Sequence, residues 1–238
     1  MNVIKIFNQL YKQHGSQNWW PVVGHNSLFE ICVGAILTQN TAWTNVEKAI
    51  KCLLKSNLMS PKAIAACPSG KLQKCIHSSG YYKQKSKKLK IFSVWLIKKY
   101  KGDLRLFFKK PLASAREELL SLWGIGPETA DSILLYAGKK PIFVIDSYTK
   151  RLCKKYGVEF KTYGEYQKFF ENNLILAVSS RAKRKTRSRG ICCGKDKICK
   201  RFLHSSFGLG RNDKLNNSTL IRIYNEFHAL IVKWGKES

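Results

Sequence analysis

One short segment combines two glycines, a proline and the start of an apolar helix in an order that suits contact with a phosphate group. It runs Leu122-Trp-Gly-Ile-Gly-Pro-Glu-Thr-Ala130. Gly124 and Gly126 permit a tight turn and a close approach of the backbone, and Pro127 fits the first turn of a following helix. The free N–H groups and positive dipole end of that helix suit an anion. The pattern predicts a helix-hairpin-helix that binds a nucleic-acid backbone, although a plain tight turn would need the same glycines.

A carboxylate follows this hairpin at the end of an apolar run. Asp146 comes directly after Pro141–Ile145 and lies twenty residues beyond Gly126. A carboxylate held in place can stabilise positive charge that develops in a transition state, and it can orient or deprotonate a water molecule. Asp146 also fits the N-cap of a helix that begins near Ser147, and capping would fix the side chain without excluding a catalytic role.

The net charge of the chain indicates a polyanionic partner. The sequence has 43 Lys and Arg residues against 15 Asp and Glu residues, which gives +28. So many positive charges repel one another and destabilise the fold, which is usually tolerated when the protein binds nucleic acid. A lysine-rich proteome would also produce a high net charge. Together with the hairpin, this predicts DNA contacts at Gly124, Ile125, Gly126, Thr129, Lys183, Arg184 and Lys185.

Two stretches, 83–110 and 181–201, hold 21 of the cations. The first predicts a packed helix with one basic face, because its lysines alternate with apolar residues at helical spacing. The second has no apolar period, and we expect a flexible basic loop that contributes to phosphate binding. Residues 181–217 form a basic insertion in this interpretation.

The remaining sequence predicts an all-α fold with a sizeable core. Apolar residues make up 44% of the 238 positions. The sequence contains no run of 18 apolar residues, so we expect neither a membrane span nor a signal segment. Only Pro141–Ile145 resembles a strand, and we expect it to be a buried connector or a short strand at most. Capping-box spacing predicts four helix starts, at Ser27 with Glu30, Thr44 with Glu47, Ser114 with Glu117 and Thr162 with Glu165.

The eight cysteines do not form an evident disulfide framework. Five are scattered along the chain, which predicts reduced and mostly buried thiols. The other three are Cys192, Cys193 and Cys199, and His204 could complete a zinc site with them. Adjacent cysteines are awkward ligands, so we expect free thiols, no metal and no cofactor.

The hairpin followed at this interval by an apolar run ending in Asp resembles the helix-hairpin-helix DNA glycosylases of the endonuclease III superfamily. The resemblance extends through Ala35–Thr41 and Gly80–Lys85, and it resumes at Tyr224–Val232. It implies that Asp146 is the catalytic carboxylate and that Gln39 helps fill the space left by a flipped base. Breaking an N-glycosidic bond develops oxocarbenium charge on the sugar, which a fixed anion would stabilise.

Two departures from the family pattern narrow the expected activity. Bifunctional members have a lysine nucleophile where this chain has Glu128, and a carboxylate cannot form an imine. The resemblance therefore implies a monofunctional glycosylase without AP lyase activity. Many relatives also continue into four cysteines that hold a [4Fe–4S] cluster, whereas this sequence ends shortly after Lys236, so no cluster is expected.

The segments Trp19–Pro21 and Thr38–Trp43 look most like the bacterial 3-methyladenine DNA glycosylases built on the endonuclease III scaffold. That resemblance implies a base pocket walled by Trp20, Trp43 and Trp19, in which indoles stack on a cationic alkylated purine. Tryptophan is also common in protein cores. No second catalytic acid is evident near Asp146, and a cationic base is already a good leaving group.

The family architecture implies two helical lobes with the active-site cleft between them. One lobe would span 26–134 and carry the hairpin, and the other would combine 1–25 with 135–238. The expected partner is double-stranded DNA with a damaged base, bound by a monomer that is cytoplasmic, nucleoid-associated and bacterial or archaeal, without membrane contact. Two alternatives stay open: a glycosylase for damaged or mismatched pyrimidines, and a non-enzymatic helix-hairpin-helix DNA-binding protein.

Overall fold

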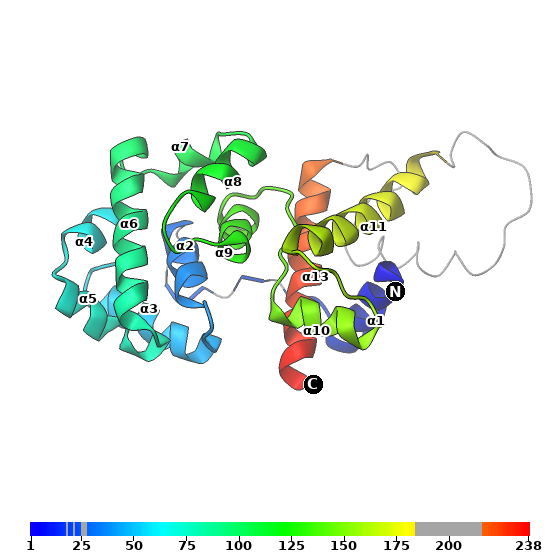
Figure 1. Cartoon of the computed structure of the whole chain (residues 1–238), viewed down its shortest axis with the longest axis horizontal. Helices are drawn as coiled ribbons and strands as arrows, with labels where there is room; N and C mark the ends of the chain where they lie inside the picture. The colour runs from blue at the N-terminus through cyan, green and yellow to red at the C-terminus, as the bar shows by residue number, and fades with distance from the viewer. Residues whose placement is uncertain (18, 21, 25–27, 184–215) are drawn as a thin grey trace, which may run out of the picture. The chain divides into compact units, whose positions relative to one another are not determined.

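A computed structural model describes residues 1–17, 19–20, 22–24, 28–183 and 216–238, with the side chains of 177–183 excepted (Figure 1). These residues form helices joined by connections without a β-strand, which confirms the all-α prediction. The chain divides into two compact units: unit 1 comprises Met1–Trp19 with Pro141–Ser238, and unit 2 comprises Trp20–Lys140. Among the described helices, none has both the length and the apolar character needed to cross a bilayer.

Unit 2 is organised around a helix that is buried on nearly all sides. In α2 (Leu28–Leu37), every residue from Phe29 onward is buried, as expected of a helix that other helices surround. Helices α3, α6 and α9 and the π-helical turn η2 pack against it. The elements after α2 are α3 (Trp43–Lys55), α4 (Pro61–Ala66), α5 (Ser69–Cys75), the 3-10 turn η1 (His77–Ser79), α6 (Tyr82–Tyr100), α7 (Leu104–Phe108), α8 (Leu112–Leu120), α9 (Pro127–Ser132) and η2 (Ile133–Ala137).

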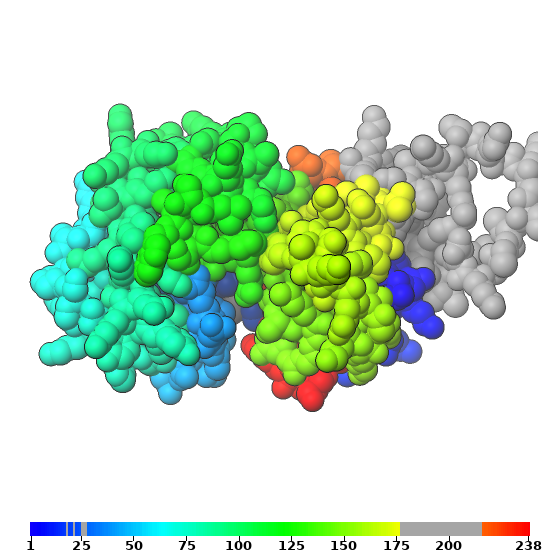
Figure 2. Space-filling model, viewed as in Figure 1, coloured from blue at the N-terminus to red at the C-terminus, as the bar shows by residue number. Residues whose placement is uncertain are grey.

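The long helix α6 confirms the prediction of a packed helix within 83–110. Leu89, Phe92, Trp95 and Leu96 are buried on one side of it, whereas most of its lysines reach the surface. Figure 2 shows that α6, α8 and α9 form much of the visible face of unit 2.

Unit 1 consists of α1 (Val3–His14), α10 (Ser147–Lys155), α11 (Tyr163–Lys183) and α13 (Asn217–Glu237) within the described residues. Helix α13 packs against α10 and α1, and α1 also packs against α11. Aromatic rings fill the centre: Phe143 stacks on Phe170 with centroids 4.7 Å apart, and it meets Tyr224 edge to face at 5.6 Å. Stacked and edge-to-face pairs of this kind add to the stabilisation that ring burial provides.

Of the two structures expected for Pro141–Ile145, a buried connector or a short strand, the connector is the one observed. Its backbone groups bond to side chains of α11. Tyr163 Oη accepts a bond from Ile145 N at 3.2 Å, Gln167 Nε2 donates to Phe143 O at 2.7 Å, and Glu171 Oε1 accepts from Phe143 N at 2.9 Å. Residues four apart share one helix face, so a single face of α11 satisfies a backbone that no neighbouring strand pairs.

One of the predicted capping boxes is confirmed. Thr162 Oγ1 accepts from Glu165 N at 3.3 Å, and Glu165 Oε2 accepts from Thr162 N at 2.8 Å. Ser27 lies outside the described residues. Its expected partner Glu30 accepts instead from the N–H groups of Val23 and Gly24, at 2.7 and 3.0 Å.

The other two predicted boxes are wrong. Helix α3 begins at Trp43, one residue before Thr44, with Ala42 at the N-cap, and Glu47 forms an ion pair with Lys51 one turn later. Helix α8 begins at Leu112 directly after Pro111, so Ser114 and Glu117 both lie inside the helix. In each case the Ser or Thr and the Glu are three residues apart, as a capping box requires, but an earlier residue is the N-cap of the helix.

The prediction of reduced, mostly buried thiols is confirmed for the five scattered cysteines. All five are free, and Cys52 is half-buried whereas Cys32, Cys67, Cys75 and Cys153 are buried. Burial raises the pKa of Cys153 to about 11, so this thiol is protonated at neutral pH.

A buried carboxylate connects α8 to α6. Glu118 accepts hydrogen bonds from Trp95 Nε1 at 3.0 Å, Lys99 Nζ at 2.9 Å, Tyr100 Oη at 2.7 Å and Lys110 Nζ. Burial alone would raise the pKa of Glu118, but these four donors outweigh it and lower the pKa to about 2. The carboxylate is therefore ionised across the physiological range and contributes to the stability of unit 2.

We expect Glu118→Gln to destabilise the fold by about 1–3 kcal/mol, because an amide cannot accept from all four donors. The folded-state pKa lies below the unfolded value, so the wild-type carboxylate stabilises the fold above about pH 4.5 and loses this effect as the pH falls toward 2. Urea unfolding at pH 7 and at about pH 3.5 measures the difference between the two proteins. The difference in the free energy of unfolding should shrink in acid. A difference that stayed constant would show that the charge of Glu118 is not responsible. The exposed neighbour in Glu117→Gln is the matched control.

Candidate functional site

Asp146 caps α10, as the sequence predicted. Its Oδ1 atom accepts hydrogen bonds from Thr149 N at 2.7 Å and from Thr149 Oγ1 at 2.8 Å. The connector before it and the helix after it fix the backbone on both sides, and the side chain is buried. The carboxylate therefore has one defined orientation. Its Oδ1 atom accepts the capping hydrogen bonds, and its Oδ2 atom takes no part in the cap.

The second carboxylate oxygen faces a histidine of α13. His228 Nε2 lies 3.5 Å from Asp146 Oδ2, and both side chains are buried. Burial alone would raise the pKa of Asp146, but the charge and hydrogen bonding of His228 and the bonds from Thr149 outweigh it, so the pKa lies below its usual value. Asp146 is thus a buried anion, and its field is less screened by water than that of a surface charge.

His228 is a neighbour of Asp146 that the sequence did not reveal, and the absence of a second catalytic acid stays a prediction. The two residues are 82 positions apart, and only packing of α13 on α10 brings them together. This packing is close: a Cβ on Gly235 would lie 2.2 Å from Tyr148 Cδ1, so a larger residue would push the helices apart. Arg151 also donates to Gly235 O at 3.0 Å.

The predicted helix-hairpin-helix is confirmed in unit 2. Helix α8 ends at Leu120, the turn passes through Gly124 with a φ of 83°, and Pro127 begins α9. Gly124 needs this left-handed conformation, which favours glycine. An ion pair between α8 and α9 holds the hairpin together, with Arg116 Nε 2.7 Å from the buried Asp131 Oδ1.

Gln39 contacts the hairpin directly. Its Nε2 atom donates to Gly124 O at 3.0 Å and to Thr129 Oγ1 at 2.8 Å, and its Oε1 atom accepts from Lys88 Nζ. Three of the residues expected to contact DNA, Gln39, Gly124 and Thr129, therefore form one hydrogen-bonded group. Lys88, which the sequence did not single out, joins them from α6.

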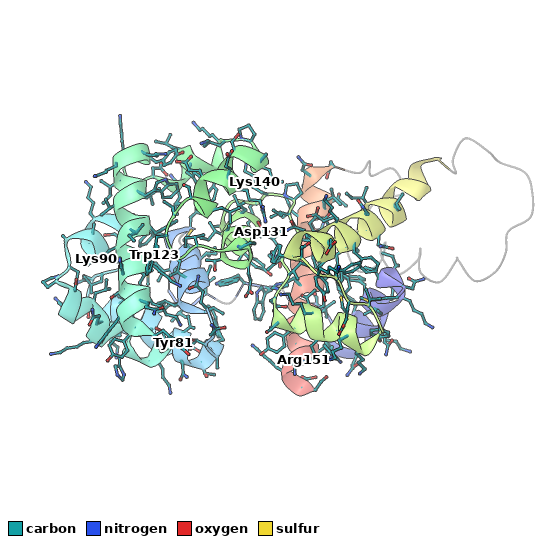
Figure 3. The ribbon with its side chains drawn as sticks, viewed as in Figure 1. Tyr81, Lys90, Trp123, Asp131, Lys140 and Arg151 are labelled. Atoms are coloured by element: carbon teal, nitrogen blue, oxygen red, sulfur yellow. The ribbon has the colours of Figure 1, made fainter. Side chains whose placement is uncertain are left out.

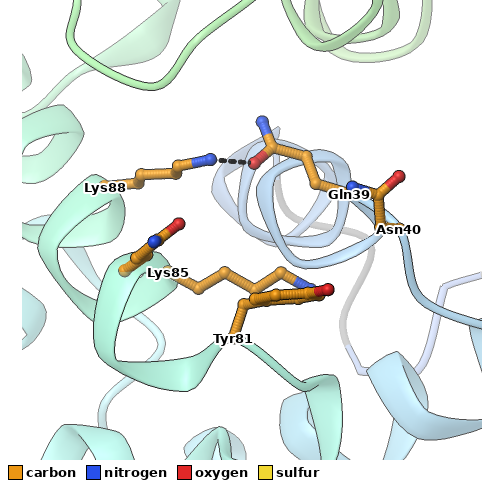
Figure 4. A pocket seen from close by; sticks show the side chains of 6 residues that line it. Gln39, Asn40, Tyr81, Lys85 and Lys88 are labelled. Carbon is orange, nitrogen blue, oxygen red and sulfur yellow. Dashed lines mark hydrogen bonds between the residues drawn. The ribbon is translucent and has the colours of Figure 1, made fainter.

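A surface pocket of about 200 Å³ lies beside this group (Figure 4). Its floor includes Lys85, a buried lysine whose Nζ atom lies 2.8 Å from Leu37 O and 2.6 Å from Ser79 O. Burial, and to a smaller extent the charge of Lys88, lowers the pKa of Lys85 to about 8. The residues that line the pocket are Gln39, Asn40, Tyr81, Gln84, Lys85 and Lys88.

Two exposed aromatic residues were not singled out from the sequence: Trp123 lies in the hairpin turn, and Tyr81 lines the pocket. Tyr81 and Trp123, labelled in Figure 3, are 65% and 50% exposed. Tyr81 lies before α6 in a left-handed conformation, with a φ of 43°, that a non-glycine residue seldom adopts. The Lys87 ammonium lies 4.6 Å from the centre of the Trp123 ring. Large exposed rings beside basic groups suit contact with nucleic-acid bases or sugars.

The structure brings together two of the three tryptophans expected in the base pocket. Trp20 and Trp43 meet edge to face with centroids 5.4 Å apart, and both are half-buried. Both contact α2 at Gly34, where a Cβ would lie 3.4 Å from Trp20 and 3.5 Å from Trp43. Trp19 belongs to unit 1, where Lys236 Nζ lies 5.4 Å from its ring centre.

The remaining predicted site residues lie in the rest of the chain. Glu128 is exposed in the first turn of α9. Within the described ranges, no group of three or more His, Cys, Asp or Glu side chains could hold a metal ion. The side chain of Lys183 and the residues Arg184, Lys185, Cys192, Cys193, Cys199 and His204 lie outside what the structure describes.

Comparison with known proteins places this geometry in a family. Residues 33–174 match the HhH-GPD superfamily, described as base excision DNA repair proteins. A protein of Methanocaldococcus jannaschii that is named as a DNA repair glycosylase is 42% identical over 176 residues, which cover 72% of this chain and 78% of that protein. Endonuclease III of Thermotoga maritima is 31% identical over 54% of this chain and 56% of its own length.

A solved structure extends the likeness over the whole chain. The structure of 3-methyladenine DNA glycosylase from H. pylori, bound to 1,N6-ethenoadenine, is similar with a TM-score of 0.75 and 30% identity. The match covers 100% of this chain and 98% of that one. The resemblance stated from the sequence is confirmed. The chain belongs to the HhH-GPD superfamily of base excision DNA repair proteins, as a DNA glycosylase of the endonuclease III type.

Proposed function

We propose that this glycosylase is monofunctional and removes an alkylated purine such as 3-methyladenine from double-stranded DNA. The observation that carries the proposal is Asp146, a buried anion fixed by the α10 cap and facing His228. Such a carboxylate can stabilise oxocarbenium charge on the sugar and orient the attacking water. A protein that only binds DNA would need no more than the α10 cap, which a neutral Ser, Thr or Asn also supplies without burying an anion.

His228 adds a proposed role in the same reaction. At 3.5 Å from Asp146 Oδ2, a charged imidazole would lower the pKa of the carboxyl and keep it ionised. Since Thr149 occupies Oδ1, both carboxylate oxygens are oriented before DNA binds. This arrangement supports catalysis by a preorganised charge and not by a mobile one.

The lesion preference rests on the two indoles of unit 2. Trp20 and Trp43 are half-buried and perpendicular, so they leave aromatic surface that a flat ligand can contact. Indole faces attract cations, which favours a positively charged base such as N3-methyladenine over neutral bases. Removal of damaged or mismatched pyrimidines is the alternative, since Endonuclease III of Thermotoga maritima also matches this chain.

The absence of lyase activity is proposed from Glu128. It is exposed in the first turn of α9, at the position where bifunctional relatives have their lysine, and a carboxylate cannot attack C1′ to form a Schiff base. We further propose that the enzyme acts as a monomer without metal or cofactor and that it is a cytoplasmic, nucleoid-associated protein. DNA phosphates would meet Gly124–Gly126, and Tyr81 and Trp123 would contact the same DNA.

Asp146→Asn should lower the rate of base excision by orders of magnitude. Asparagine can still accept from Thr149 N, so the cap and the fold should survive, whereas the negative charge is lost. Single-turnover excision from a 3-methyladenine duplex measures the rate, and a binding titration should show unchanged or tighter DNA affinity. Glu159→Gln removes an exposed charge from the same unit and is the control. Full activity in Asp146→Asn would refute the catalytic assignment.

The wild-type protein should release the base without cutting the resulting abasic strand. Borohydride reduces an imine to a stable amine, so it should trap no covalent protein–DNA complex on lesion DNA. A bifunctional endonuclease III, run in parallel, shows that trapping works under the conditions used. A trapped adduct that mass spectrometry maps to any lysine of this chain would overturn the monofunctional proposal.

Trp43→Ala should lose about 1–3 kcal/mol of discrimination between lesion and normal bases, the range for stacking of a base on an aromatic ring. Trp43→Phe should fall between, because a smaller ring keeps stacking but weakens the cation–π attraction. Single-turnover excision and Tm are measured on the same samples. If Trp43→Ala lowers Tm but leaves excision per folded molecule intact, Trp43 serves the core and not the base pocket.

A further inference from the structure

Gln39 is restrained from two sides, although it lies at a surface pocket. Its Nε2 atom donates to Gly124 O at 3.0 Å and to Thr129 Oγ1 at 2.8 Å, on the hairpin side. Its Oε1 atom accepts from Lys88 Nζ of α6, the contact drawn as a dashed line in Figure 4. A glutamine amide has two N–H donors and one acceptor oxygen, so nearly all of its bonding capacity is used within the protein.

The chemistry of the partners fixes which way the amide points. An ammonium group can only donate, so Lys88 requires the oxygen of Gln39 on its side. A backbone carbonyl can only accept, so Gly124 O requires the nitrogen on the other side. Rotating the amide by 180° would place two acceptors together and two donors together, which makes the observed orientation the stable one.

Lys88 is itself held in place by the hairpin. Its aliphatic chain runs across Gly124, where a Cβ would lie only 2.6 Å from Lys88 Cε and 2.7 Å from Lys88 Cγ. The glycine at 124 therefore serves a second purpose besides its positive φ, because any larger residue would displace this lysine. Burial lowers the pKa of Lys88 from its usual value. The neighbouring Lys87, by contrast, is exposed and lies over Trp123.

We propose that Lys88 is a positioning residue, which fixes the side chain of Gln39 in one orientation before DNA binds. The inference rests on the proposed function and on the role that the family resemblance implies for Gln39, which is to enter the space left by a flipped base. Both Nε2 hydrogens are already bonded, so Gln39 meets DNA through the remaining lone pair of Oε1, as a hydrogen-bond acceptor. Ordering a glutamine in advance removes an entropy cost that binding would otherwise include.

The competing interpretation is that Lys88 neutralises a DNA phosphate directly. The two roles predict different behaviour. A phosphate contact acts independently of Gln39, and its loss lowers the slope of log affinity against log salt by about one. A positioning role acts only through Gln39, so its loss leaves the salt slope unchanged and has no further effect once Gln39 is removed.

A double-mutant cycle with Lys88→Met and Gln39→Ala tests the proposal. Single-turnover excision is measured on a 3-methyladenine duplex, and affinity is measured on a duplex with a tetrahydrofuran abasic analogue over a range of salt. We expect Lys88→Met to reduce excision and abasic-site affinity about tenfold, in line with one hydrogen bond to a charged group. The double variant should be no weaker than Gln39→Ala. Additive losses, or a salt slope lowered by about one in Lys88→Met, would overturn the proposal.

Two further variants separate hydrogen bonding from charge and from folding. Lys88→Gln keeps a neutral N–H donor, so it should recover part of the loss if Lys88 acts on Gln39, and recover nothing if its charge binds phosphate. Lys98→Met removes an equal charge from an exposed position of α6 and should leave both measurements unchanged. Tm shows whether a variant is destabilised. If Lys88→Met is, the same cycle is measured with Lys88→Gln in its place.

The abasic duplex also separates this inference from the proposed function. Binding to it needs no chemistry, so coupling between Lys88 and Gln39 on this probe supports the positioning role even if wild-type protein does not excise 3-methyladenine. Excision by the wild type without any coupling would support the proposed function and reject the positioning role.

Discussion

A buried stretch of extended backbone at 141–146 determines how unit 1 is built. Its polar groups have no strand beside them, and a buried N–H or C=O without a partner costs about as much as a lost hydrogen bond. The side chains of Tyr163, Gln167 and Glu171 supply those partners from one face of α11. Because the connector is fixed in this way, Asp146 at its end has a defined position, and α10 begins there.

In unit 2, buried charged side chains hold neighbouring elements together through hydrogen bonds. Glu118 gathers four donors between α6 and α8, and Lys85 bonds to the backbone carbonyls of the last residues of α2 and η1. In a chain with a charge of +28, lysine is the most available donor, and several lysines serve as internal hydrogen-bond partners. The excess of positive charge therefore has a structural component besides any attraction to DNA phosphates. Net charge alone would overstate the number of lysines free to bind DNA.

The features predicted correctly from the sequence are those whose signals are local. The hairpin requires only neighbouring glycines and a proline, and the Asp146 cap requires only the helix that follows it. His228 and Lys88 were missed because they reach their partners through packing, across 82 and 49 positions. No spacing rule connects such residues. The N-caps of α3 and α8 were misplaced by two and three residues, since a Ser or Thr with a Glu three residues on also occurs inside helices.

The two groups assigned to function differ in how they are held, and the difference follows from their chemistry. Asp146 stays an anion while buried because Thr149 donates twice to Oδ1 and His228 lies beside Oδ2. Gln39 is neutral, so its position can be set by hydrogen bonds at the surface that cost little desolvation. Under the proposed function, charge stabilisation would come from a buried part of unit 1, whereas contact with the DNA duplex would lie on an open face of unit 2. A glycosylase needs both properties, and each unit provides the environment that one of them requires.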